Sequence, residues 1–253
     1  MTSSIDLAEI LFTLFWLFFI GLVLYLHREG KREGYPLESD RSGSVTVQGF
    51  PGVPEPKEYQ LFHGGTVQAP RDEPFQELQN AEPVADHYGA PIRPTGDPMT
   101  SGVGPGAYAN RDDEPDLNIH GKPRFVPLRI AEGFHVDRRD PDPRGMDVLG
   151  ADGEVAGQVS EIWVDNVEPM LSYYEVQLTP ERGGRRVMLP VTFSKVNRGK
   201  RTVNVRAIYA DQFANVPGIA SDEQITRLEE DKIAAYYAAG TLYADEKRQE
   251  PLI

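Results

Sequence analysis

The sequence predicts one N-terminal transmembrane α-helix followed by a mainly β cytoplasmic domain, a small antiparallel barrel, with a short C-terminal helix. Three observations predict this fold class. An uncharged apolar run occupies residues 10–26, short segments of alternating apolar residues recur between 155 and 207, and a helix-capping pattern stands at 221–224. Such patterns are typical of a membrane span, of β-strands and of a helix start, respectively.

The chain is expected to have three regions. Residues 1–33 form a periplasmic N-terminus and the transmembrane helix, and residues 34–124 form an extended cytoplasmic segment rich in Pro and Gly. Residues 125–253 form the barrel domain with its C-terminal helical extension. A chain of 253 residues is long enough to bury a sizeable core in one large or two smaller domains.

The run from Ile10 to Leu26 is the strongest signal in the chain. It has no charged residue, and thirteen of its seventeen side chains are aliphatic or Phe. A helix of this length spans roughly 25 Å, and these side chains contribute roughly −4 to −8 kcal/mol to membrane insertion. A buried soluble helix would usually keep a polar face, and a cleaved signal peptide would have basic residues before the run.

Charges flank the run asymmetrically. Asp6 and Glu9 stand before it or at its start, whereas the stretch 27–32 that follows it is basic. The positive-inside rule therefore predicts a single-pass protein with its N-terminus in the periplasm and its C-terminal bulk in the cytoplasm.

The basic flank also predicts a contact with membrane lipid. Four residues near the cytoplasmic boundary offer hydrogen bonds and positive charge to an anionic headgroup: Tyr25, Arg28, Lys31 and Arg32. Ordinary anchoring of the helix end at the interface explains the same residues equally well.

Composition excludes several classes of function. A formal net charge of −13 argues against nucleic acid as a partner. The chain has no cysteine and only five widely spread histidines, so we predict no metal site and no thiol chemistry. No P-loop is present, because Pro105 removes an amide donor from the glycine-rich stretch 102–106, which we interpret as a turn. None of these patterns therefore supports an enzyme, and the same holds for a nucleophile elbow, which is absent from the sequence.

The stretch from Gly34 to Pro123 holds thirteen of the twenty-one prolines, so we expect mostly irregular structure there. Apolar residues such as Phe50, Tyr59 and Leu61 keep recurring within it. That recurrence favours an extended segment lying over a partner rather than a disordered linker.

The C-terminal half predicts short strands joined by tight turns. We expect strands at 155–164, 173–178, 187–196 and around 203–207. A closed or curled sheet would hide their edges. The pattern Ser221-Asp-Glu-Gln224 predicts the start of a helix that ends before Gly240, and His135 is expected to pack against the barrel.

Several ordered blocks resemble a known family. They are Arg32-Glu-Gly-Tyr-Pro-Leu-Glu38, Thr95-Gly-Asp-Pro-Met99, Gly102-Val-Gly-Pro105, Gly133-Phe-His-Val136, Ile162-Trp-Val-Asp165 and Leu228-Glu-Glu-Asp-Lys-Ile233. In their residues and in their order along the chain, these blocks resemble the H subunit of purple-bacterial photosynthetic reaction centres. The resemblance covers nearly the whole chain and implies that the barrel is a PRC-barrel.

The resemblance also implies a place in a complex. The chain would be a structural subunit of the bacterial inner (intracytoplasmic, or chromatophore) membrane that caps the cytoplasmic face of the L and M subunits. It would ligate no pigment itself, because bacteriochlorophyll, bacteriopheophytin, quinones and the non-haem iron are held by L and M. The cytochrome subunit, the core light-harvesting antenna and a bound cardiolipin would be further partners.

The resemblance implies, in addition, a role in conducting protons to the secondary quinone. Asp165 and Glu168 match the family's carboxylates near the quinone route, and Glu168 is the strongest candidate. The sequence alone favours a solvated loop acid before Pro169, and the resemblance reverses that preference. His120 matches one of two histidines at the family's proton-uptake surface. Lys122 replaces the second histidine and Asn118 replaces an acid, which puts divalent-metal binding there in doubt.

Two other readings remain open from the sequence. The chain could be a membrane-tethered PRC-barrel adaptor unrelated to photosynthesis, which its acidic charge and the Arg32–Glu38 block disfavour. A membrane-anchored hydrolase is the second, and no cluster of nucleophile, base and acid supports it.

Overall fold

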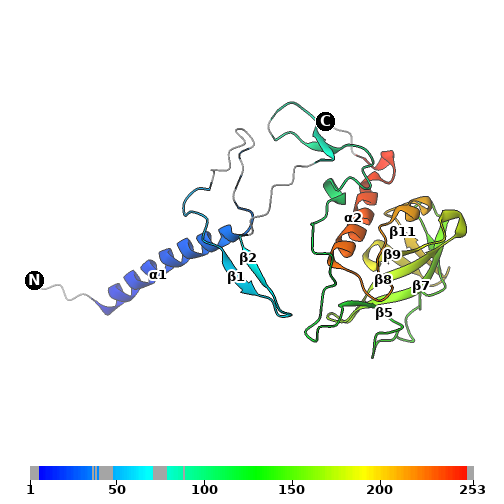
Figure 1. Ribbon diagram of the computed structural model, residues 1–253, viewed down its shortest axis with the longest axis horizontal. Helices are drawn as coiled ribbons and strands as arrows, with labels where there is room; N and C mark the ends of the chain where they lie inside the picture. The colour runs from blue at the N-terminus through cyan, green and yellow to red at the C-terminus, as the bar shows by residue number, and fades with distance from the viewer. Residues whose placement is uncertain are drawn as a thin grey trace, which may run out of the picture. The chain divides into compact units, whose positions relative to one another are not determined.

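The computed structural model describes residues 6–35, 37, 39, 48–70, 79–87 and 89–249 (Figure 1). The chain divides into two compact units, one of Met1–Glu77 with Ala85–Ala90 and the other of Leu78–Val84 with Pro91–Ile253. Pro36 and Glu38 of the block after the apolar run lie outside the described residues.

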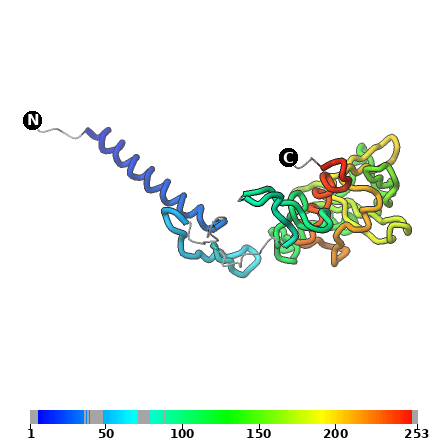
Figure 2. Tube along the Cα trace, turned by 90° about the horizontal axis from the view of Figure 1, so that it is seen from above, coloured from blue at the N-terminus to red at the C-terminus, as the bar shows by residue number. Residues whose placement is uncertain are grey.

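Helix α1 spans Leu7–Glu29 as one unbroken helix (Figure 2). Asp6 caps it, because its side chain accepts a hydrogen bond from the backbone N–H of Ala8 at 3.2 Å. None of its residues is buried in the protein, and an 18-residue window within Leu7–Arg32 has a mean hydropathy of 2.4. A helix that is apolar all round needs lipid or a partner around it. The predicted N-terminal membrane helix is thus confirmed as a helix long and apolar enough to span a bilayer.

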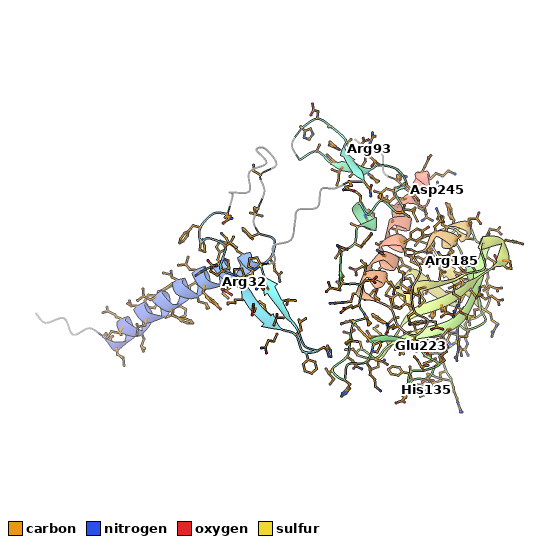
Figure 3. The ribbon with its side chains drawn as sticks, viewed as in Figure 1. Arg32, Arg93, His135, Arg185, Glu223 and Asp245 are labelled. Atoms are coloured by element: carbon orange, nitrogen blue, oxygen red, sulfur yellow. The ribbon has the colours of Figure 1, made fainter. Side chains whose placement is uncertain are left out.

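A small hairpin is attached to the C-terminal end of α1. After the short 3₁₀ helix η1 (Gly30–Arg32), strands β1 (Lys57–Gln60) and β2 (Thr66–Ala69) pair antiparallel. The Arg32 guanidinium donates to the Glu29 carboxylate at 2.9 Å and to the carbonyl of Ala69 at 3.0 Å (Figure 3). Arg32 therefore ties the helix end to the hairpin.

The start of the second unit is largely irregular, as the prolines predict. It contains only a short hairpin, β3 (Ala81–Pro83) with β4 (Ile92–Pro94), and the 3₁₀ turn η2 (Gly104–Gly106). The predicted turn at 102–106 is confirmed, with positive φ at Gly102 and Gly104. Gly106 lies so close to the C-terminal helix that an added Cβ would stand 3.1 Å from the Cβ of Ala239.

A seven-stranded sheet forms the body of the second unit. Its strands are β5 (Phe125–Pro127), β6 (Asp147–Leu149), β7 (Val155–Asp165), β8 (Met170–Leu178), β9 (Arg186–Pro190), β10 (Ser194–Asn197) and β11 (Thr202–Val205). The order is β10-β11-β6-β7-β8-β9, and β5 pairs with β7 off this path. All pairs are antiparallel except β11 with β6.

The core lies between this curled sheet and helix α2 (Arg227–Tyr243), which runs alongside β9 and β11 in Figure 1. Trp163 and Tyr237 are the largest side chains buried in it. The Tyr237 hydroxyl donates to the carbonyl of Met188 on β9 at 3.1 Å, which satisfies its buried polar atom. His135, which we expected to pack against the barrel, is instead exposed on the loop before β6 (Figure 3).

One predicted strand is two. The strands predicted at 155–164 and 173–178 are confirmed as β7 and β8, the second three residues longer at its start. The stretch 187–196 breaks after Pro190 into the 3₁₀ turn η4 (Val191–Phe193) and β10. A proline has no N–H for the ladder, so the chain turns there and β10 pairs with β11 rather than β8.

The predicted helix start was wrong by five residues, since the cap is Thr226 and not Ser221. The capping box is formed by Thr226 and Glu229: the Thr226 hydroxyl accepts from the Glu229 N–H at 3.1 Å, and the Glu229 carboxylate accepts from the Thr226 N–H at 2.9 Å. Residue Ile225 just before it is buried in the core, which fixes the chain before the helix. The helix also continues past Gly240, where an added Cβ would stand 2.3 Å from Cγ2 of Ile208. That glycine permits close packing and is not a stop signal.

Replacing Thr226 by Ala should therefore lower the free energy of unfolding by about 1 kcal/mol, because one N-terminal amide of α2 loses its acceptor. Chemical denaturation of the full chain in detergent, followed by the fluorescence of buried Trp163, measures this. Ser221→Ala is the matched control at the cap position that the sequence suggested. A larger loss for Ser221→Ala than for Thr226→Ala would contradict the assignment.

Candidate functional site

A buried ion pair lies where β5 meets the end of β7. The carboxylate of Asp165, on a residue that is 1% exposed, ends β7 beside Phe125 of β5. The guanidinium of Arg124, just before β5, donates to Oδ2 of Asp165 through Nε at 2.7 Å and lies within 2.6 Å of it through Nη2. Arg124 also reaches Asp116 at 3.5 Å and stacks over the Phe125 ring. Arg124 therefore has two carboxylates against it, one of them buried.

The same carboxylate holds the loop that follows β7. Oδ1 of Asp165 accepts hydrogen bonds from the backbone N–H groups of Val167 at 2.7 Å and Glu168 at 3.0 Å. Asn166 adds a second anchor, because its backbone N–H donates to the carbonyl of Arg124 and its side-chain amide donates to the carbonyl of Pro123. The loop 166–169 is thus fixed at its base, while Glu168 itself is exposed.

These contacts decide the charge state of Asp165. Burial alone would raise the pKa of its carboxyl, but hydrogen bonds from Arg124 and from the two loop amides outweigh burial and lower the pKa below its ordinary value. Asp165 therefore stays ionised at neutral pH. A carboxylate held in this way is a good anchor and a poor carrier of protons near neutral pH.

The loop that carries His120 is fixed by Asn118. The side-chain oxygen of Asn118 accepts hydrogen bonds from the backbone N–H of His120 at 2.9 Å and of Lys122 at 3.1 Å. Both the His120 and Lys122 side chains are exposed. Asn118 thus serves the backbone of this loop, a task that needs an acceptor oxygen but no negative charge.

A cavity of about 490 Å³ brings this loop and the next one together. His120, Glu132, Asn166 and Glu223 line it, together with Lys122 and neighbouring residues of 118–132. Glu168 is not part of the lining, although Asn166 is two residues away from it. One histidine and two carboxylates therefore border one hollow next to the Glu168 loop.

A third acid lies near Arg124. Glu230, in the first turn of α2, is partly buried, and burial raises the pKa of its carboxyl although the positive charge of Arg124 opposes the shift. The carboxylate of Glu230 accepts a hydrogen bond from the hydroxyl of Tyr173 on β8, and burial and Glu230 both raise the pKa of that hydroxyl. The pKa of Glu230 therefore moves toward neutral pH, where a proton carrier works best.

No group of three or more His, Asp or Glu side chains converges as metal ligands anywhere in the part of the chain that the structure describes. Cysteine is absent from the whole sequence.

The four predicted lipid-contact residues fall into two pairs. Tyr25 and Arg28 lie on α1 with exposed side chains. The ammonium of Lys31, by contrast, is buried and donates to the carbonyls of Gln48 and Pro51, and Arg32 is occupied by Glu29 and the hairpin. Only the first pair is free to meet a headgroup, since the second holds the chain's own backbone.

Two protein-family models match successive parts of the chain. A family model for the photosynthetic reaction centre, H-chain N-terminal region, matches residues 1–130, and a PRC-barrel domain model matches residues 135–212. The first match covers more than half of the 253 residues. The chain belongs to the reaction-centre H-chain family.

As an H chain, the protein is a subunit of a photosynthetic reaction centre, and the family associates with the L and M subunits in that complex. Pigments and quinones of the complex belong to other subunits. The helix α1 fits single-pass anchoring in the membrane, and the barrel is a PRC-barrel. The match also disfavours a PRC-barrel adaptor unrelated to photosynthesis.

Sequence reasoning missed two residues of this H chain's cluster. Arg124 carries a charge that two carboxylates share, and Glu230 has the carboxyl with the raised pKa. The sequence signal for Arg124 was weak, because only its position just before a strand set it apart. Glu230 lies within the block 228–233 that resembles the family. Because the helix start was placed too early, the side of the helix on which Glu230 lies could not be predicted. The proposed roles of Asp165, Glu168 and His120 stay predictions.

Proposed function

We propose that this chain covers the cytoplasmic face of the L and M subunits, stabilises the secondary quinone site there and delivers protons to that quinone. Glu168 is the last residue of this subunit to hold the proton before it passes toward the quinone. The observation that supports the proposal most is the anchoring of the Glu168 loop: one buried, ionised carboxylate holds two of its amides and an arginine at the same time.

The anchoring matters because proton transfer depends on position. A donor and acceptor must come within about 2.6–3.2 Å of each other, directly or through one water. Asp165 fixes the base of the loop, so that Glu168 is presented from a rigid support while its side chain stays exposed for a partner. In this assignment Asp165 is a positioning residue, and Glu168 is the group that takes up and releases the proton.

The remaining groups supply protons to the loop. His120, Glu132 and Glu223 border the cavity beside Asn166 and would collect protons from the cytoplasm. Glu230, whose carboxyl pKa is raised by burial, would exchange protons with these groups near Arg124. The positive charge of Arg124 would also favour negative charge on the reduced quinone. A covered quinone exchanges less with bulk water, which keeps proton uptake on this route.

Glu168→Gln tests the central residue. The amide cannot release a proton, so we expect the second electron transfer to the quinone, which is coupled to protonation, to slow by about tenfold. Flash absorption of the purified complex between pH 6 and 9 measures the rate. The matched control is Glu181→Gln, an exposed acid on the 3₁₀ turn η3 (Pro180–Arg182) of the same unit. A rate for Glu168→Gln equal to that of the control would remove Glu168 from the route.

We further propose that Tyr25 and Arg28 hold the headgroup of an anionic lipid such as cardiolipin. Replacing both by Phe and Gln, respectively, should lower the cardiolipin retained by the purified complex about threefold, because a hydrogen bond and a charge are lost. Lipid mass spectrometry of the complex gives the ratio. Arg93→Gln, at an exposed cation on β4, is the control. Equal retention in the three proteins would refute the lipid contact.

A further inference from the structure

A long stretch of this acidic chain carries positive charge alone. Residues 182–210 contain no Asp or Glu, although the whole chain has a net charge of −13. The stretch has eight cations: Arg182, Arg185, Arg186, Lys195, Arg198, Lys200, Arg201 and Arg206. A positively charged region on a protein of negative net charge favours a negatively charged partner, which the rest of the surface repels.

Three of these cations are occupied within the fold. Arg182 pairs with Asp211 at 3.1 Å, and Arg186 pairs with Glu175 at 3.3 Å. Arg185 donates to the carbonyls of residues 214 and 216. The other five belong to β10, β11 and the turn between them or directly after them. None of these five forms an ion pair with a carboxylate that the structure describes.

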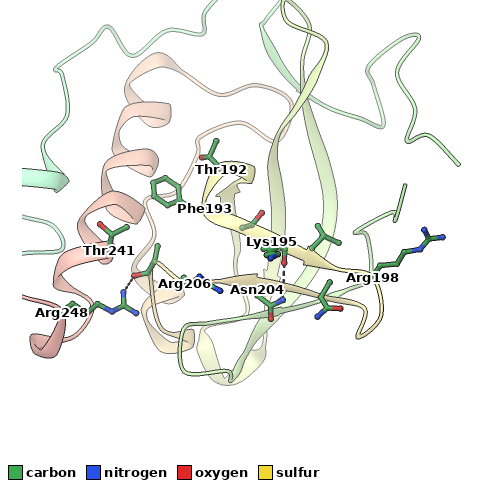
Figure 4. A pocket seen from close by; sticks show the side chains of 12 residues that line it. Thr192, Phe193, Lys195, Arg198, Asn204, Arg206, Thr241 and Arg248 are labelled. Carbon is green, nitrogen blue, oxygen red and sulfur yellow. Dashed lines mark hydrogen bonds between the residues drawn. The ribbon is translucent and has the colours of Figure 1, made fainter. Parts of the chain in front are cut away.

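A pocket of about 930 Å³ opens beside this hairpin (Figure 4). Lys195, Arg198, Arg206 and Arg248 line it, and no acidic residue does. The guanidinium of Arg248 is fixed, because it donates to the carbonyls of Ala207 and Gly240 at 2.8 Å each. Uncharged polar side chains complete the lining: Thr192, Ser194, Asn197, Asn204 and Thr241.

The pocket runs along a strand edge. All seven consecutive residues from 192 to 198 line it, which includes the end of the turn η4, every residue of β10 and the first residue after that strand. β10 pairs with β11 on one side and, among the described residues, with no strand on the other. A free edge presents unpaired backbone N–H and C=O groups, which another extended chain can pair with.

We propose that this pocket, the β10 groove, binds an extended acidic segment of another protein as an added strand. Backbone hydrogen bonds to the outer edge of β10 would hold the segment, and its carboxylates would meet Lys195, Arg206 and Arg248. The length of the lining favours a peptide over a small anion, because the four residues of β10 alone span about 13 Å and the lining continues at both ends of the strand. Arg124 and the acids near it, Asp116, Asp165 and Glu230, do not line the groove. The peptide-binding proposal therefore does not depend on proton transfer.

The test uses the full chain in a non-ionic detergent and a fluorescent peptide of about nine residues in which glutamate alternates with threonine. We expect saturable binding by anisotropy and slower amide hydrogen exchange in β10. A second peptide alternates glutamate with proline, keeping the charge while losing backbone donors, and should bind about tenfold more weakly. The double variant Lys195→Glu/Arg206→Glu should weaken the first peptide by about tenfold or more.

Arg138→Glu is the matched control, since Arg138 is an exposed cation of the same unit outside the groove. Unchanged Trp163 fluorescence shows that each variant is folded. Equal binding of the two peptides, or equal binding by the control and the double variant, would overturn the proposal. The proposal would also be overturned if neither peptide bound and inorganic phosphate or phosphatidylglycerol vesicles slowed amide hydrogen exchange in β10. Self-association of the chain that the double variant abolishes would reassign the groove to a second copy.

Discussion

Asp165→Asn is expected to lower the free energy of unfolding by about 2 to 3 kcal/mol. The side chain of Asp165 is 2% exposed and that of Arg124 is 29% exposed, so the substitution leaves a largely covered guanidinium without its main counter-ion. The amide oxygen of Asn can still accept the two loop N–H groups, which makes this a test of the charge rather than of the whole network. Urea denaturation followed by Trp163 fluorescence measures the loss.

Asp116→Asn is the control for Asp165→Asn, because Asp116 approaches the same guanidinium at 3.5 Å but has a side chain that is 45% exposed. An exposed partner contributes little, so we expect a loss under about 0.5 kcal/mol. Equal losses for the two variants would contradict the assignment of Asp165 as the main partner of Arg124.

The pH dependence of this effect has a definite sign. The pKa of Asp165 is lower in the folded protein than in the unfolded chain, so its stabilisation is complete above the unfolded value of about 4. That stabilisation is lost as the pH falls through the lowered folded-state value. The difference in free energy of unfolding between the wild type and Asp165→Asn should therefore be constant from pH 5 to 8 and become smaller below about pH 4. If this difference became larger in acid, Asp165 would have to be protonated in the native state.

Gly157→Ala is expected to be the most damaging single substitution in the sheet. An added Cβ would stand 2.2 Å from the carbonyl oxygen of Gln177 and 2.8 Å from Cα of Leu178, both backbone atoms of β8. Backbone atoms of a paired strand cannot rotate away, so β7 and β8 would have to separate. We expect a loss of about 3 kcal/mol or more in the free energy of unfolding.

Gly218→Ala is the matched control for that substitution. Its added Cβ would meet only the end of the Arg185 side chain at 3.7 Å, an ordinary contact. Stability there should be unchanged or slightly raised, because alanine restricts the unfolded chain more than glycine does. If Gly157→Ala unfolded at the same denaturant concentration as Gly218→Ala, the close approach of β7 and β8 at this position would be wrong.

Local patterns predicted much of the fold. The run 10–26 was long and uncharged enough to identify α1, a strand-like stretch identified β7, and alternation of apolar residues identified β8. The errors arose where tertiary contacts decide. Thr226 rather than Ser221 caps α2 because Ile225 is buried before it, and Gly240 lies inside α2 because Ile208 packs against it. Neither contact is visible in a short stretch of sequence.

The candidate site was predicted only in part, and for the same reason. The resemblance pointed to Asp165 and Glu168, but the partner of Asp165 lies 41 residues earlier in the chain. Local sequence cannot show which arginine crosses to which carboxylate. Glu230 lies farther still along the chain, on a different element, and its raised pKa depends on burial against β8. Distant pairings of this kind follow from the fold.

Assignment of the chain to a proton-delivering reaction-centre subunit can be tested by affinity purification of the tagged chain from its native membranes, followed by near-infrared absorption and light-driven proton uptake. We expect bacteriochlorophyll and bacteriopheophytin absorption to co-purify with the chain, and a flash series to produce proton uptake that is slower in Glu168→Gln. A chain that leaves the membrane without pigment, or proton uptake at the same rate in the variant, would contradict this assignment.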